Sequence, residues 1–411
     1  MSVHEKKTET KLIHSTEEGN LDSNTRAIHV PVYFSTTFHQ KSIDHFGPYT
    51  FQREDFDQLG PYDDSKSTNP ARQSLEEQIA DLEGGERGFA FVSGMAAISS
   101  AFMLLSAGDH ILISENIYRG TYLLITNVLE KFRIDYTSVD MTNLDETAKA
   151  IQPNTKVIYI ETPSNPCLHI TDLEGVIKIA KSNGCLSLVD NTFMTPLYQT
   201  PIKLGADVVL HRDARLLSGH QDIKAGLAVT KNQELGRDLA YIQSAYGSIL
   251  GAQDSWHLTQ GIKTLAVRLD RSSDSAQKIA DFLHKHPFVE DVFYPGLSFH
   301  PGNPIHQRQT KGSGTMLSFR LSNKRMTEAF VESIQLPIFA PSHGAVESIL
   351  SYPATMSHAT MPKIERERRG ITDSLLRLSV GLEHVTDLIQ DIDQALQVAA
   401  KKTNVGVIHT P

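Results

Sequence analysis

Two short apolar runs in the middle of the chain each end on a polar residue that can do chemistry. Leu186–Val189 is followed by Asp190, and Ala206–Leu210 is followed by His211. Short apolar runs of this kind are typical of buried parallel strands, and the residues at their carboxyl ends face the ligand crevice of an α/β protein. We therefore expect Asp190 and the segment 211–220 to lie at one site.

The residues around this site resemble those of a known family. The chain reads VDNTF at 189–193, then GAD and an apolar run ending in His, then SGH-x-D at 218–222. These motifs resemble the transsulfuration family of pyridoxal-phosphate enzymes, which includes cystathionine γ-synthase, the cystathionine lyases and methionine γ-lyase. Where that family reads H-S-A-T-K-Y-L-S-G-H-S-D, this chain reads HRDARLLSGHQD. The family's Schiff-base lysine falls on Arg215, and its two phosphate-binding hydroxyls fall on Arg212 and Ala214.

An arginine at position 215 changes the chemistry that the resemblance implies. A Schiff base needs a neutral amine, whereas a guanidinium stays protonated and is a poor nucleophile. For the same reason arginine cannot move protons between substrate and cofactor as the family's lysine does. Lys203 and Lys224 are near in sequence, but neither matches a position from which the family's chemistry is done. We therefore predict no covalent pyridoxal phosphate, and at most weak non-covalent binding or none.

A second part of the phosphate site also departs from the family. The family reads Y-D-Y-S-R-S-G-N-P-T-R, and its second Tyr and its Arg reach the cofactor phosphate of the neighbouring subunit; these positions are Asp64 and Lys66 here. Lys66 keeps a positive charge without the bidentate fork, and the Asp64 carboxylate repels a dianion. We hypothesise that Asp64 of one subunit pairs with Arg212 or Arg215 of the other and fills the cofactor site. Unrelated losses without such a contact are the alternative.

Other family motifs are retained. Residues 93–95 begin a helix of small residues, where free backbone N–H groups form an anion cradle that matches the family's SGMAA phosphate loop. The resemblance assigns binding roles to the residues that follow: Ser93, Gly94 and Met95 to the phosphate, Tyr118 to the ring face, Asn165 to the ring hydroxyl, Asp190 to the ring nitrogen, and Ser342 and Arg377 to the substrate. A carboxylate at the nitrogen keeps the ring protonated, and an arginine can clamp the substrate carboxylate with two parallel donors.

Composition limits the classes of partner and location. The chain has 411 residues, a formal net charge of −9 and no dense Lys/Arg block, so we expect no nucleic-acid partner. No apolar run is long enough to predict a membrane span, and the polar start MSVHEKKTETK lacks the apolar stretch of a secretory signal. Two cysteines give no disulfide framework and favour a cytoplasmic location. No metal site is predicted.

The order of the expected elements indicates an α/β fold with two domains. Alternating strands and helices from about 85 to 230 predict a large, doubly wound, mostly parallel sheet, as in fold-type I aminotransferase-like proteins. We expect an N-terminal arm at 1–60, the large domain at 61–257, a smaller α+β domain at 258–400 and a tail at 401–411. Residues 1–11 are expected to be a frayed tail, and the rest of the arm is expected to lie on another subunit.

Three interpretations of function remain open. The first is a non-catalytic homologue that acts as a structural or regulatory partner of itself or of an active paralogue, as a dimer or tetramer, or that binds a small amino-acid ligand. The second is an enzyme with reassigned chemistry or with non-covalent pyridoxal phosphate. The third is an ordinary C–S lyase or γ-transferase acting on cysteine- or homocysteine-type substrates, which the SGH-x-D register disfavours.

Overall fold

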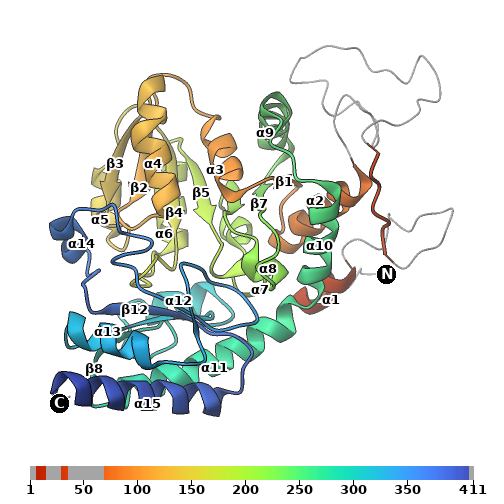
Figure 1. The fold of residues 1–411 in the computed structure, drawn as a ribbon. Helices are drawn as coiled ribbons and strands as arrows, with labels where there is room; N and C mark the ends of the chain where they lie inside the picture. The colour runs from red at the N-terminus through yellow and green to blue at the C-terminus, as the bar shows by residue number, and fades with distance from the viewer. Residues whose placement is uncertain (1–5, 15–28, 36–68, 407–411) are drawn as a thin grey trace, which may run out of the picture.

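The structure is a computed structural model that describes residues 6–14, 29–35 and 69–406 (Figure 1). The described chain holds two β-sheets. One has seven strands in the order β1-β7-β6-β5-β4-β2-β3, and the other has five in the order β10-β11-β12-β9-β8. None of the described helices is long and apolar enough to cross a membrane.

The larger sheet is mostly parallel, as predicted. Only β7 runs antiparallel to its two neighbours. Alternate residues of β4 contribute to different hydrophobic clusters, Ile158 to one and Tyr159 to the other, because both faces of the sheet are buried. Its strands are β1 (Arg87–Phe91), β2 (His110–Ser114), β3 (Asp135–Val139), β4 (Thr155–Glu161), β5 (Leu186–Asp190), β6 (Val208–His211) and β7 (Gly226–Thr230).

Helices precede and connect the strands of this sheet and cover it. The first of them, α2, shows why the chain turns helical where it does. Asn69 caps it by accepting the N–H of Ala71, Pro70 occupies its first turn, and Gly84 ends it with a φ of 76°. The elements of this part are α2 (Pro70–Glu83), α3 (Gly94–Phe102), α4 (Arg119–Asn127), η4 (Leu129–Phe132), α5 (Leu144–Lys149), α6 (Leu173–Ser182), α7 (Thr195–Tyr198), η5 (Pro201–Leu204), α8 (Arg215–Ser218), α9 (Gln233–Tyr246) and α10 (Ala252–Lys263).

The smaller sheet has its own core and is mostly antiparallel. Figure 1 shows α13 and α15 packed side by side against it, with the long helix α11 running from the larger part of the molecule. Its elements are α11 (Leu265–Lys285), β8 (Val289–Phe293), α12 (Asn303–Gln309), β9 (Met316–Leu321), α13 (Lys324–Ser333), β10 (Ile338–Phe339), β11 (Ile349–Ser351), α14 (Lys363–Arg368), β12 (Leu375–Ser379) and α15 (Val385–Thr403).

Two details differ from the sequence prediction. Residues 8–11 are not a frayed tail, because α1 (Thr8–His14) is helical and its Leu12 is fully buried in the core of its own chain. The carbonyl of Leu12 also accepts a hydrogen bond from Gln78. The sequence pattern of residues 253–286 predicts one long helical bridge, but the structure forms two helices, α10 and α11, that meet at Thr264. The domain boundaries stay a prediction.

Candidate active site

The candidate site begins at two neighbouring strand ends. Glu161 ends β4 and Asp190 ends β5, and the two residues face each other in the parallel register of the sheet. Both side chains are buried, and the hydroxyl of Tyr159 lies 3.2 Å from an oxygen of each. The backbone N–H of Tyr118, at the start of α4, donates to Glu161 at 2.7 Å. The parallel register of β4 and β5 thus brings two buried carboxyl groups together beside an aromatic residue.

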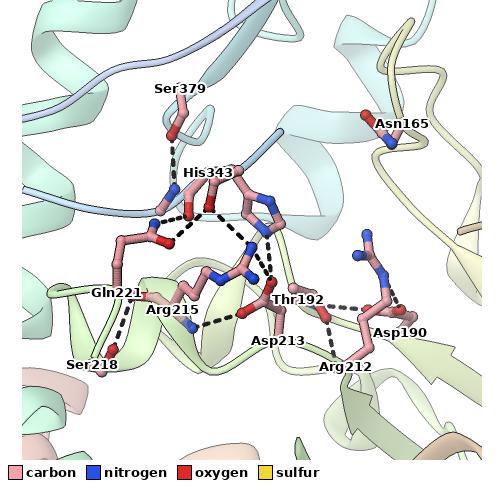
Figure 2. A network of polar contacts seen from close by, with 12 residues as sticks. Asn165, Asp190, Thr192, Arg212, Asp213, Arg215, Ser218, Gln221, His343 and Ser379 are labelled. Atoms are coloured by element: carbon pink, nitrogen blue, oxygen red, sulfur yellow. Dashed lines mark hydrogen bonds and ion pairs between the residues drawn. The ribbon is translucent and has the colours of Figure 1, made fainter. Parts of the chain in front are cut away.

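The side chain of Arg212 lies against these groups. Its Nε is 2.8 Å from Asp190 Oδ2, and its guanidinium carbon is 4.6 Å from the centre of the Tyr118 ring. One terminal nitrogen lies 3.8 Å from Glu161, and the ring of Phe193 is 5.4 Å away. The Arg212 side chain is only 6% exposed. Figure 2 shows it turned toward Asp190, away from Arg215.

The charges of this cluster respond to burial and to one another. Burial raises the pKa of Glu161 to about 7, with Arg212 opposing the rise and Asp190 adding to it. Burial alone would lower the pKa of Arg212, but the Asp190 and Glu161 carboxylates outweigh it and hold that pKa above its ordinary value. Arg212 therefore stays protonated, and its positive charge lies closer to Asp190 than to Glu161.

Arg215 points in a different direction. Its guanidinium lies 3.2 Å from Asp213 and donates to the hydroxyl of Ser342 at 3.0 Å. That hydroxyl in turn donates to Gln221. The side-chain amide of Gln221 donates to the carbonyl of His343 (Figure 2). Arg215 therefore ties α8 to the loop before β11, and its side chain is 30% exposed.

Arg377, on β12, also contacts the loop before β11 that carries Ser342. It donates to Asn165 Oδ1 at 2.6 Å and to the carbonyl of Ser342 at 2.8 Å. Its Nε is buried without a hydrogen-bond partner among the described residues. Burial first, and then the positive charges of Arg212 and Arg215, lower the pKa of Arg377 to about 10. A buried guanidinium with an unsatisfied donor is a suitable place for an anionic ligand group.

The start of α3 forms another wall of the site. Ser93 caps this helix by accepting the N–H of Ala96, and Gly94 is its first residue. A Cβ at Gly94 would lie 1.5 Å from the carbonyl oxygen of Arg212, so glycine is required for this close approach. The helix start that was predicted to hold a phosphate therefore packs directly on the backbone of Arg212.

Other predicted residues lie elsewhere. His211 does not face Asp190; its ring lies 2.8 Å from the buried Glu83. His220 is exposed and bonds the carbonyl of Ser218, so only part of the segment 211–220 contributes to the cluster. Lys203 and Lys224 are exposed. Ala214 is fully buried just before α8.

The hypothesis that Asp64 pairs with Arg212 or Arg215 stays untested, because Asp64 and Lys66 lie outside the described residues. Arg212 and Arg215 already have acidic partners in their own chain, namely Asp190 and Asp213.

Sequence reasoning missed two groups that complete the site. His343 is buried with its ring 5.2 Å from Phe193, and its Nε2 lies 3.7 Å from Asp213. Burial, followed by the three nearby arginines, holds the pKa of His343 well below its usual value, so the ring is neutral. Phe193 belongs to the VDNTF motif, so its position was available as a signal. His343 comes from a loop more than 100 residues away, and no spacing points to it.

The observed side chains do not fit pyridoxal phosphate in the way the resemblance implies. Tyr118 and Asp190, predicted for the ring face and the ring nitrogen, both contact the guanidinium of Arg212. The position predicted for the lysine carries Arg215, which is paired with Asp213. The described site therefore presents no amine for a covalent link and has a protein side chain against its aromatic wall.

The fold and the site define a protein built on the frame of pyridoxal-phosphate enzymes. The sequence profile of the family described as Cys/Met metabolism PLP-dependent enzyme matches residues 9–397, where PLP is pyridoxal phosphate, and the chain belongs to this family. It is 54% identical to cystathionine beta-lyase MetC of Bacillus subtilis, over 97% of this chain and 99% of that protein. It is 45% identical to the cystathionine gamma-lyase of the same organism, over 95% and 99%.

A solved structure is similar over nearly the same length. Cystathionine gamma-lyase from Lactobacillus plantarum, complexed with L-serine, superposes with a TM-score of 0.89 at 42% identity, covering 96% of this chain and 99% of that one. The predicted family and fold class are confirmed.

Proposed function

We propose that this chain is a non-catalytic member of its family. It would serve as a subunit of an oligomer, formed either with copies of itself or with an active paralogue. The observation that carries the proposal is the pair of arginines. Arg212 lies between Tyr118 and Asp190, and Arg215 stands at the position that resembles the family's lysine. Neither guanidinium can form an imine or act as the proton-transferring base. Self-association and a cytoplasmic location remain predictions.

A catalytic role within the family is the second candidate. The identity to cystathionine lyases extends over almost the whole chain, and Arg377, Asn165 and Ser342 lie together as a substrate-binding group would. Such an enzyme would act on cysteine- or homocysteine-type substrates with non-covalent pyridoxal phosphate or with reassigned chemistry.

Two measurements on the purified wild-type protein separate the candidates. After incubation with pyridoxal phosphate and reduction with borohydride, we expect mass spectrometry to find no pyridoxyl adduct on any lysine. With cystathionine and pyridoxal phosphate, we expect no release of thiol above a protein-free control. An adduct on a lysine, or turnover that scales with protein concentration, would replace the non-catalytic assignment with the enzymatic one.

We further propose that the retained group around Arg377 binds the carboxylate of a small amino acid. Charge-assisted hydrogen bonds contribute about 1.5–3 kcal/mol each, so Arg377→Gln should weaken binding roughly 10- to 100-fold. Calorimetric titration with L-serine and L-cysteine checks this, and Arg308→Gln, a change at an exposed arginine on α12, is the matched control. Equal affinities in the wild type and both variants would refute the site.

A further inference from the structure

We propose that the side chain of Arg212 occupies the place that the ring of the cofactor would take. This side chain, and not only the presence of arginine instead of lysine at position 215, therefore excludes pyridoxal phosphate. This inference rests on the proposed non-catalytic function. It makes a separate statement, however, because it predicts what happens when an amine is returned to position 215 while Arg212 stays in place.

The contacts of Arg212 are those that a protonated pyridine ring would make. The guanidinium is planar and cationic, it lies over the Tyr118 ring at 4.6 Å, and its Nε forms an ion pair with Asp190 at 2.8 Å without a well-aligned hydrogen bond. A protonated pyridine ring is likewise planar and positively charged, and its plane stacks on an aromatic face. The two groups therefore compete for the same aromatic wall and the same carboxylate.

The backbone of Arg212 is fixed so that this side chain stays in the site. Its N–H donates to the hydroxyl of Thr192 at 2.9 Å, as Figure 2 shows. Its carbonyl lies against Gly94 so closely that no Cβ would fit between them. With both sides of the peptide held, only rotation of the side chain can clear the aromatic wall.

Rotation is opposed by charge. Arg212 is the nearest cation to both Asp190 and Glu161, which are 2% and 4% exposed. Leaving the site would strand the buried Asp190 carboxylate, and the Glu161 carboxylate where it is ionised, without a counter-charge. The open state is therefore rare. An open fraction on the order of 1% would weaken the apparent affinity for a ligand of the open site about 100-fold.

Arg215 makes contacts that are separate from those of Arg212. It bonds Asp213 and Ser342, and within the described chain neither of these two residues forms a hydrogen bond or an ion pair with Arg212. A lysine introduced at 215 would therefore provide an amine next to a site that is still filled.

The test returns a lysine to position 215 with and without the side chain of Arg212. The variants are Arg215→Lys, Arg212→Ala/Arg215→Lys and, as a matched control, Arg325→Ala/Arg215→Lys, which changes an exposed arginine on α13. The probe is pyridoxal phosphate. Binding is measured by equilibrium dialysis, and covalent attachment by borohydride reduction and mass spectrometry.

We expect the variant with both Arg212→Ala and Arg215→Lys to bind pyridoxal phosphate about 100-fold more tightly than the other two and to carry an adduct on the introduced lysine. Equal labelling of Arg215→Lys alone would overturn the inference, and so would a folded double variant that binds no more tightly. Thermal unfolding establishes folding first. If Arg212→Ala does not fold, Glu161→Gln is added to it, because this removes one of the two buried carboxyl groups that Arg212 faces.

These outcomes differ from those that decide the proposed function. An adduct or lyase turnover in the wild-type protein would refute the non-catalytic assignment whatever the variants do. Conversely, an inactive and unlabelled wild type, together with efficient labelling of Arg215→Lys alone, would leave that assignment intact and refute the role of Arg212.

Discussion

Replacing Arg212 with methionine is expected to lower the free energy of unfolding by about 3–5 kcal/mol, because it strands buried carboxylates. Methionine keeps much of the length of the side chain and its apolar contact with Tyr118 and Phe193. The substitution removes the charge that lies 2.8 Å from Asp190 and 3.8 Å from Glu161. Urea unfolding at pH 7.5, followed by circular dichroism, measures the loss.

The matched control is Arg215→Met, which removes the same charge from a side chain that is 30% exposed. The pair is partly screened by solvent, because its two side chains are 30% and 17% exposed, so this variant should lose on the order of 1 kcal/mol, well below the loss in Arg212→Met. If both variants lose the same small amount of unfolding free energy, Arg212 is not the counter-ion of the buried acids, and the proposed charge arrangement of the site is wrong. A large loss in the control alone would shift the structural role to Arg215.

Much of the frame could be predicted because it depends on local patterns. The apolar runs of β4 and β5 are short and end on acids, and parallel pairing then places the ends of neighbouring strands at one edge of the sheet. The limits of α2 follow from Asn69, Pro70 and Gly84, whose preferences act within a few residues. The position of Asp190 in the site needed nothing else.

The directions of the two arginines could not be predicted in the same way. They are three residues apart, and the sequence allowed either to pair with an acid from another subunit. The structure turns Arg212 to Asp190 and Arg215 to Asp213, because one reaches the buried edge of β5 and the other begins the short helix α8. Side-chain direction here depends on partners that only the folded chain assembles.

The N-terminal segment gave a different kind of error. Residues 1–11 are mostly polar, a composition that indicates a frayed end, but the helix α1 begins at Thr8. The single buried Leu12 and the ion pair between Lys11 and Asp81 hold the helix to α2 nevertheless. One residue that fits the core can outweigh a polar composition when its backbone is also bonded, as the carbonyl of Leu12 is to Gln78.

A second large effect is expected from pH, through Glu161. In the folded chain burial raises the pKa of this carboxyl from 4.5 to about 7. Between these values the folded state keeps a proton that the unfolded state has lost. The contribution to stability is therefore complete below about pH 4.5 and is lost as the pH rises through 7. The shift corresponds to about 3 kcal/mol over this window.

Glu161→Gln should remove this dependence, because the amide stays neutral and can still accept the N–H of Tyr118. We expect the difference in unfolding free energy between the variant and the wild type to move by about 3 kcal/mol in favour of the variant from pH 4.5 to pH 7.5. Urea unfolding across this range measures it, and Glu332→Gln, at a side chain that is 69% exposed, is the control. A difference that is constant with pH would mean that burial does not raise the pKa of Glu161, which would then be ionised over most of this range. Arg212 would then balance two full negative charges, whereas a protonated Glu161 leaves it matched one-to-one with Asp190.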